Sequence, residues 1–333
     1  MKTIRWHLGS LKYKFLMWLL ATWEHRTGTL LTFHTRPLYA SGVTHASHPL
    51  VTPPSCTIVL QGPILHTEHF TLETVRLYKK IYPWAHIVVS TWEGEDTREI
   101  EEENVEVLYN SFPAYRGPYN VNLQIISARE GVRKAKELGT QYTLKTRTDQ
   151  RMYNPNIFEG MVNALTFFPA GQLSKQHSRL LFATGGHVYR SALLPDMFVF
   201  GDTHDMLEYW DAPLVPEDAP NPGNDTIFRP ELYLGSTFLS KKGWQLDWTV
   251  AQMWDIYREC FVFFDWSEID LYWYKYRRYS EHEERKCYES GSSANNLMGF
   301  MQWFNIISNK ENKKIPDDTH LPHANSKSNP TAD

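Results

Sequence analysis

Two arginines and one aspartate at the end of an apolar run are the residues of this chain best suited to chemistry. Arg147, Asp149 and Arg151 alternate in the segment RTDQR, directly after residues 142–146. Guanidinium groups match phosphate oxygens in geometry and carry a permanent charge. A carboxylate can hold a divalent cation when phosphate oxygens and water complete the shell. The cluster therefore suits a phosphorylated ligand, with Mg²⁺ or Mn²⁺ at Asp149 or with Arg147 in place of the metal.

The residues before this cluster predict the elements that position it. Residues 121–138 have the apolar spacing of a helix, which stops at Gly139-Thr140, and residues 142–146 read as a buried strand. Ligands of open α/β sheets bind in the crevice outside the carboxyl ends of the strands. The cluster is therefore predicted to lie at a ligand-binding edge.

The upstream sequence repeats this alternation. Strands are expected at 57–60, 85–90 and 105–109, and a helix at 71–82 that Pro83 closes. Alternating strands and helices predict an α/β fold with a mostly parallel, Rossmann-like sheet flanked by helices. Residues 51–150 would form its nucleotide-binding half.

The second half of the chain is less regular. Strands are expected at 180–184 and 196–200, and helices near 205–210 and 231–238. A charged helix at 275–286 and a disordered tail at 310–333 are expected from their polar composition.

Composition excludes some classes of protein. The formal net charge of −4 gives no overall basic field, so nucleic acid is not an expected partner. The three cysteines lack metal-site spacing and indicate a reducing, cytoplasmic compartment. No P-loop, zincin or hydrolase motif is present.

The first 50 residues are read as a basic, aromatic helix followed by a linker. Lys2, Arg5, Lys12, Lys14 and Arg26 are interspersed with tryptophans and leucines. The apolar run 15–21 is far shorter than the ~20 residues that span a bilayer. Two interpretations remain open: a helix lying in the interface of an anionic membrane on its cytoplasmic side, or a helix packed on the core.

Further ligand contacts are expected where other strands end and where the long helix begins. A glycine at position 62 would let the backbone approach a ligand, and Gln61 could bond a base edge. The plain alternatives are an ordinary turn at residues 61–63, a place in the core for Trp92, and a helix cap for Asn120 or Asn122. The expected nucleotide-sugar contacts are Gln61, Gly62, Pro63, Thr91, Trp92, Asn120, Asn122 and Gln124. Weaker loop candidates are His187, Arg190, Asn224 and Asp225.

Three acids are candidates for a general base. Asp202, Asp205 and Glu231 follow a predicted strand or open a predicted helix. Each has a plain alternative, since Asp202 fits an N-cap and the other two would favour the positive end of a helix dipole.

Several segments together resemble a known family. The segment up to Asp149 resembles the core of inverting GT-A glycosyltransferases, in which a D-x-D motif ends the strand. Over a longer stretch the chain resembles the WavE family, associated with lipopolysaccharide and surface-glycan synthesis. The segments are TIVLQGPI (57–64), YPWAHIVVSTW (82–92), NLQIISAREG (122–131), LKTRTDQR (144–151), FVFGDTHDMLEYW (198–210) and RPELYL (229–234).

The resemblance implies a GT-A-like domain at 51–309, with the acceptor half at 151–309, that moves a sugar from a nucleotide donor to a lipid-linked glycan. One departure is that Arg147 stands where the first acid of D-x-D is expected. That departure allows one alternative, a non-catalytic glycan-binding or assembly protein that kept the fold. A second alternative is a sugar-phosphate nucleotidyltransferase on a related fold, although the glycine-rich, lysine-containing opening loop usual in such enzymes is absent.

Overall fold

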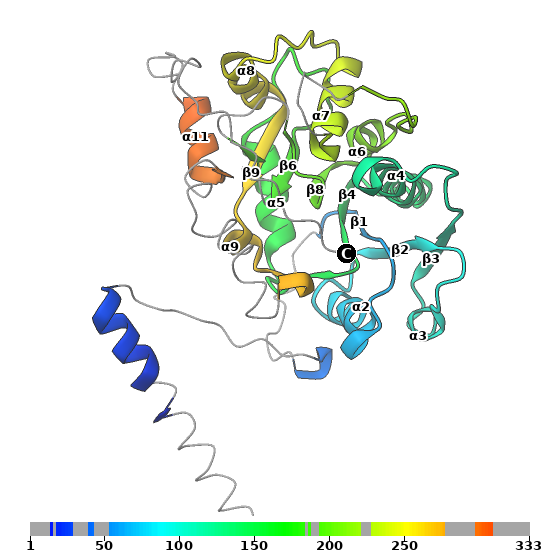
Figure 1. Cartoon of the computed structure of the whole chain (residues 1–333), viewed down its shortest axis with the longest axis vertical. Coiled ribbons are helices and arrows are strands. Elements are labelled where there is room, and N and C mark those ends of the chain that lie inside the picture. Colours follow the sequence, from blue (N-terminus) through cyan, green and yellow to red (C-terminus); the bar gives the residue numbers. More distant parts are fainter. Residues whose placement is uncertain are drawn as a thin grey trace, which may run out of the picture. The chain divides into compact units, whose positions relative to one another are not determined.

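The computed structural model describes residues 14–15, 18–28, 39–42, 53–183, 186–187, 193–220, 228–276 and 297–308 (Figure 1). The chain divides into two compact units, residues 1–38 and 39–333. Arg190, Asn224, Asp225, most of the expected charged helix and the polar tail lie outside the described residues.

The large unit contains helices and strands that mostly alternate along the chain. The strands are β1 (Cys56–Gln61), β2 (His86–Trp92), β3 (Glu106–Asn110), β4 (Tyr142–Arg147), β5 (Gln150–Met152), β6 (Leu180–Ala183), β7 (Gly186–His187), β8 (Phe198–Asp202), β9 (Phe261–Phe264), β10 (Leu271–Trp273) and β11 (Leu297–Met298). The helices are α2 (Phe70–Ile81), α3 (Arg98–Glu101), α4 (Val121–Glu137), α5 (Ile157–Phe167), α6 (Thr203–Trp210), α7 (Pro230–Lys241), α8 (Val250–Cys260), α9 (Trp266–Ile269) and α11 (Phe300–Ser308). Single 3₁₀ turns are η1 (Ala40–Gly42), η2 (Thr67–His69), η3 (Pro118–Asn120) and η5 (Tyr274–Tyr276).

A seven-stranded sheet in the order β3-β2-β1-β4-β8-β6-β9 forms the centre of this unit. All neighbouring strands pair in parallel except that β8 runs antiparallel to both β4 and β6. This is the expected α/β fold, a mostly parallel, Rossmann-like sheet flanked by helices. The four strands and two long helices predicted in the first half are confirmed as β1 to β4, α2 and α4.

The central strands are buried because helices cover both faces of the sheet. Every residue of β1 is buried, as an apolar strand of a parallel sheet requires. Helices α2 and α4 connect strands in opposite directions across the sheet, so right-handed crossovers place them on opposite faces. At Gly131, α4 approaches β1 so closely that a Cβ would stand 2.3 Å from Val59 Cγ1. Helices α4, α6 and α7 follow one another along their face (Figure 1).

The antiparallel strand β8 has an aspartate near each of its ends, and these ends lie at opposite edges of the sheet. Its last residue, Asp202, pairs with Tyr142 at the amino end of β4. Its first residues lie instead beside the carboxyl half of β4, where Val199 pairs with Lys145. Asp196, just before β8, is therefore near the ligand-binding edge, and Asp202 is at the opposite edge.

Part of the segment expected to be a linker belongs to the large unit. Ala40 is buried, and its backbone N–H donates to Glu73 Oε2 of α2 at 2.6 Å. Two cysteines, Cys56 and Cys260, are buried free thiols, while Cys287 lies outside the described residues.

The small unit contains the expected N-terminal helix, with residues 18–27 helical. Its aromatic side chains are exposed, Phe15 and Trp18 each at 60% and Trp23 at 43%. Within the part of the chain that is described, no helix has the length and apolar character needed to cross a bilayer.

Candidate functional site

A cavity of about 190 Å³ lies where the strand order of the sheet reverses. The chain passes from β1 outward to β3 on one side and places β4 on the other, so β1 and β4 flank the switch point at which such sheets bind ligands. The cavity is lined by Gln61, Gly62, Pro63, Ile64, Leu65, Arg147, Thr148 and Asp149. The structure thus brings Gln61, Gly62 and Pro63 together with Arg147 and Asp149, as the sequence predicts.

Thr148 holds the two strand ends together. Its backbone N–H donates to Gln61 O at 3.1 Å, and its hydroxyl donates to Pro63 O at 2.6 Å. The Thr71 hydroxyl at the start of α2 donates in turn to Thr148 O at 3.0 Å. Gly62 has φ +125°, and a Cβ there would meet Thr148 Oγ1 at 3.1 Å, so this turn needs glycine. The cavity therefore has a preformed floor.

Arg147 and Asp149 form a two-pronged ion pair at the cavity. Arg147 Nε lies 2.8 Å from Asp149 Oδ1 and its terminal nitrogen 3.0 Å from Oδ2. The Trp273 indole N–H donates to the same Oδ2 at 3.0 Å, and its ring lies 5.4 Å from the Arg147 guanidinium. Burial opposes ionisation of Asp149, but the Arg147 and Trp273 contacts outweigh it and lower its pKa. The Arg147 side chain is still one-third exposed within this pair.

These contacts do not suit a divalent cation at Asp149. Among the residues that line the cavity Asp149 is the one acid, both its oxygens accept hydrogen bonds, and Arg147 already balances its charge. A metal ion would have to displace Arg147 and overcome its charge. The residues around Asp149 therefore do not fit a bound metal ion.

A second group of ionisable side chains lies next along β4. Lys145 and Arg147 are two residues apart on the strand and so face the same side of the sheet. The buried Lys145 ammonium donates to Asp196 O at 2.6 Å and lies 4.6 Å from the ring of Trp210 on α6. Asp196 is itself buried, and its charge acts on Glu231 in the first turn of α7.

Burial shifts the pKa values in this group. Burial first, and then the charge of Asp196, raises the pKa of Glu231 to about 7. Burial lowers the pKa of Lys145 to about 7, while the Asp196 and Asp149 charges oppose that change and Arg147 adds to it. Strongly shifted pKa values in neighbouring groups are typical of catalytic sites. A carboxylate that titrates near neutrality is suited to take a proton from a hydroxyl.

Arg151 does not reach the cavity. It is 2% exposed, and its guanidinium donates to Thr74 Oγ1 at 2.9 Å and to Phe70 O at 2.9 Å. It also lies 4.2 Å from the Phe70 ring. Both arginines were expected to meet a phosphate, but the chain turns at Thr148 and Asp149 into β5, which directs Arg151 toward α2.

The other residues expected to bind the donor lie around the same edge but do not line the cavity. Trp92 is 3% exposed and stacks on Phe112 at 4.7 Å, so it belongs to the core. Asn122 makes three hydrogen bonds, to Tyr115 O and to both backbone groups of Val215. Gln61, which does line the cavity, donates its amide N–H to Ser127 Oγ of α4 at 2.9 Å.

Three other predicted contacts, at the strand and helix ends, have either a buried polar atom without a hydrogen-bond partner among the described residues or an unusual backbone conformation. Thr91 is fully buried, and its hydroxyl has no hydrogen-bond partner among the described residues. Gln124 Oε1 is likewise buried without a partner there. Asn120 sits at the start of α4 with φ +60° and makes no side-chain cap.

Asp202 and Asp205 lie at the opposite edge of the sheet from the cavity, and both have structural partners. Asp202 caps α6 by accepting from His204 N at 2.9 Å, which confirms the N-cap interpretation. Asp205 is fully buried and accepts from the backbone N–H groups of His177 at 2.8 Å and Ser178 at 2.9 Å. Of the three predicted bases, Glu231 alone belongs to the group around Lys145.

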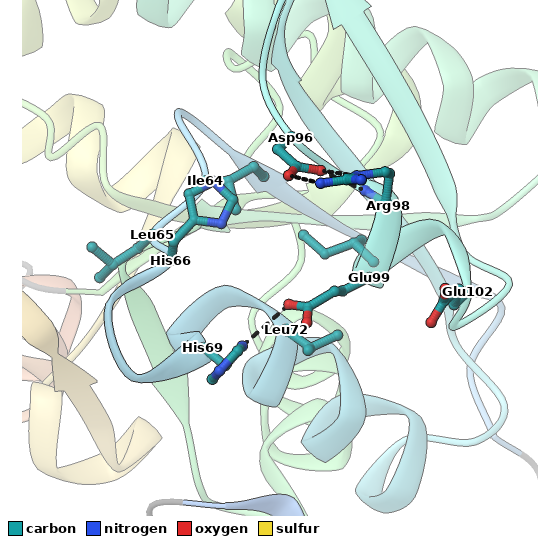
Figure 2. Close-up of a pocket in the computed structure, with 10 residues that line it drawn as sticks. Ile64, Leu65, His66, His69, Leu72, Asp96, Arg98, Glu99 and Glu102 are labelled. Carbon is teal, nitrogen blue, oxygen red and sulfur yellow. Dashed lines mark hydrogen bonds and ion pairs between the residues drawn. The ribbon is translucent and has the colours of Figure 1, made fainter.

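A larger cavity of about 450 Å³ adjoins the first, since both include Ile64 and Leu65. It lies between the loop after β1 and helix α3 (Figure 2). Figure 2 shows two pairs among its polar side chains, Arg98 with Asp96 and His69 with Glu99, whose atoms lie 2.7 Å and 3.1 Å apart. The larger cavity also contains an arginine, Arg98, but only the smaller of the two is lined by the ends of both β1 and β4 at the switch point.

Sequence reasoning missed Lys145, Asp196 and Trp273. A lysine inside a run that both faces of a parallel sheet bury is a signal that could have identified Lys145. Asp196 was expected only as the start of a strand. Trp273 comes from a two-stranded ribbon, β5–β10, whose partner is far away in sequence.

Comparisons with solved structures give distant likenesses. A glycosyltransferase involved in glycosylation of the major capsid of PBCV-1 is 12% identical, with 63% of this chain and 83% of that chain covered and a TM-score of 0.33. A cytidylyltransferase from Leptospira borgpetersenii serovar Hardjo-bovis is 12% identical, with 80% and 100% covered and a TM-score of 0.36. CMP:2-keto-3-deoxy-manno-octonic acid synthetase with CTP is 8% identical, with 64% and 90% covered and a TM-score of 0.36.

A search of curated proteins finds no match. The family model for WavE lipopolysaccharide synthesis matches residues 56–228, more than half of the chain and all of the β1–β4 switch point. The chain belongs to the WavE lipopolysaccharide synthesis family.

Proposed function

We propose that the protein is a glycosyltransferase that moves a sugar from a nucleotide-sugar donor to a lipid-linked surface glycan. The observation that carries the proposal is the Arg147 guanidinium at the switch-point cavity, together with a base-like carboxylate, Glu231, whose charge interacts with Asp196, the hydrogen-bond partner of Lys145. The family supports a role in lipopolysaccharide synthesis.

The proposed transfer is a direct displacement with inversion. An acceptor hydroxyl attacks the anomeric carbon while the bond from that carbon to the donor phosphate oxygen breaks. The phosphate leaves with the bonding electrons, and Arg147 stabilises its growing negative charge. Glu231 accepts the hydroxyl proton as the new glycosidic bond forms.

In this proposal the phosphate is held without a metal ion. Asp149 fixes the Arg147 fork, and Trp273 fixes Asp149, so the guanidinium is preorganised. A preorganised cation costs little reorganisation at the moment of reaction. A monophosphate leaving group, as in CMP-activated sugars, would need less charge compensation than a diphosphate.

The N-terminal helix supplies a means of staying near a lipid-linked acceptor. Phe15 and Trp18 are exposed with stacked rings 6.0 Å apart, and Lys14 lies beside them in sequence. Exposed aromatic residues on a basic helix favour the interface of anionic membranes. The full-length protein should sediment with anionic vesicles, and the double variant Trp18→Ser with Trp23→Ser should stay in the supernatant.

A sugar-phosphate nucleotidyltransferase and a non-catalytic glycan-binding protein are the two competing functions. Incubation with UDP-, GDP- and CMP-sugars should release free nucleotide in the presence of a glycan acceptor. Release of pyrophosphate from a nucleoside triphosphate and a sugar phosphate would identify the nucleotidyltransferase instead. Nucleotide binding with no turnover of any donor would favour the non-catalytic protein.

A further inference from the structure

A second cluster of ionisable side chains lies at the amino edge of the sheet, away from the switch-point cavity. It joins the loop before β6 to the first two turns of α6. We call it the histidine–carboxylate cluster, and its members are His177, Asp202, His204, Asp205 and Glu208. We propose that this cluster binds one divalent cation of the zinc type and thereby fastens α6 to the preceding loop.

The ligand atoms already lie near one another. In the set His177, Asp202 and Asp205, one nitrogen or oxygen of each side chain is within 4.8 Å of the others. The same holds for His204, Asp205 and Glu208, so Asp205 links the two sets. Ligand atoms at ~2.1 Å from a zinc ion are separated by somewhat less than this, and small side-chain rotations would close the difference.

The histidines can make those rotations. His177 is 62% exposed and His204 is 49% exposed, and their rings stack with centroids 4.5 Å apart. His177 Nδ1 lies 3.3 Å from Asp202 Oδ1, and His204 Nδ1 lies 3.8 Å from Glu208 Oε2. Each imidazole is therefore already beside a carboxylate that would share the ion.

The charge of the cluster favours a dication. Asp202, Asp205 and Glu208 supply three negative charges, while Lys242 is the cation that pairs with them among the described residues. With neutral imidazoles the remaining charge is −2, which matches one divalent ion. Nitrogen and carboxylate oxygen together are the ligands that zinc prefers, whereas magnesium and calcium favour oxygen alone.

Lys242 and Asp205 provide a rigid base for the site. Asp205 is fully buried, and Lys242 donates to its Oδ1 at 3.2 Å, while its Oδ2 accepts two backbone N–H groups. Hydrogen bonds of this kind orient a metal ligand and support its affinity. The exposed histidines then complete the site from the solvent side.

The test is zinc binding to the full-length, chelator-treated protein, followed by calorimetry and by cobalt absorption spectroscopy. The expected result is one zinc ion per chain with micromolar or tighter affinity, and a melting temperature that rises with zinc. The double variant His177→Ala with His204→Ala should lose at least ~100-fold in affinity and the thermal shift. His69→Ala is the matched control, because His69 also lies beside a carboxylate, Glu99, and should keep full binding.

Three outcomes would overturn the site. They are millimolar zinc binding only, equal binding by the double variant, and an equal loss in the His69 control. Since the readouts are binding and melting temperature, they are independent of whether the glycosyltransferase activity is found.

Discussion

The guanidinium of Arg147 and the carboxylate of Asp149 face each other across two hydrogen bonds of 2.8 and 3.0 Å at the carboxyl end of β4. The pair occupies the edge at which open α/β sheets bind their ligands. In the proposed function the two residues have different tasks: Arg147 supplies the charge, and Asp149 fixes its direction.

Replacing Arg147 by lysine should lower kcat/KM by roughly 100-fold, in the range found for losing one preorganised donor at a transition state. Lysine keeps the positive charge but loses the planar fork that matches phosphate. Steady-state kinetics with the active donor measures the effect. Unchanged kinetic constants for Arg147→Lys would show that Arg147 does not bind the donor phosphate.

Replacing Arg151 by lysine should instead lower stability. Arg151 is buried, and its fork donates to Thr74 and Phe70, so lysine leaves at least one buried acceptor unpaired at a cost of about 1–3 kcal/mol. Urea unfolding measures that loss. Kinetic constants per folded molecule should stay close to wild type, whereas a selective loss of kcat would place Arg151 in the site after all.

Replacing Glu231 by glutamine should reduce kcat by about 10²–10⁴-fold, the contribution of a general base. In the wild type, the rate should fall as pH drops below about 7, because the raised pKa of Glu231 leaves the base protonated there. Asp202→Asn, at the opposite edge of the sheet, is the matched control and should keep both the rate and the pH profile. A profile that is flat from pH 6 to 8 would argue against Glu231.

The same shift predicts how stability depends on pH. The folded protein binds the Glu231 proton more tightly than the unfolded chain, so this group makes the protein less stable as pH rises from about 4.5 to about 7. The full shift corresponds to roughly 3 kcal/mol. Glu231→Gln should therefore be more stable than wild type at pH 8 and similar at pH 4.5. Equal stability of the two proteins at both pH values would show that Glu231 is not shifted.

Replacing Gly62 by alanine should damage the cavity. An L-residue at φ +125° is strained by about 1–3 kcal/mol, and the new methyl group would press on the Thr148 hydroxyl. We expect a lower melting temperature and a raised KM for the donor. Normal donor affinity in a destabilised Gly62→Ala protein would show that this turn does not contribute to donor binding.

The parallel half of the fold could be predicted because local signals and tertiary structure agree there. Apolar runs such as Ile58–Leu60 and the helical spacing of α4 describe the elements that a buried parallel sheet needs. The same agreement placed Gln61, Gly62 and Arg147 at one edge, since parallel strands end on the same side.

The rest of the site depends on long-range pairing that periodicity does not reveal. Asp196 rather than Asp202 stands at the ligand-binding edge because β8 runs antiparallel to β4, and the five residues of β8 do not indicate that direction. Trp273 reaches Asp149 through pairing of β10 with β5, more than 100 residues apart. Arg151 turned inward because the chain bends at Thr148, which the alternation of charges did not show.

The most direct test of the account is calorimetric binding of UDP, GDP and CMP to the wild type and to Arg147→Ala, each with Mn²⁺ and with EDTA. The account predicts that at least one nucleotide binds in EDTA and that Arg147→Ala loses this binding, while Asp202→Asn keeps it. Binding that requires Mn²⁺ would contradict the role of Arg147 as the metal's substitute. Failure of all three nucleotides to bind would contradict the proposal that the protein is a glycosyltransferase.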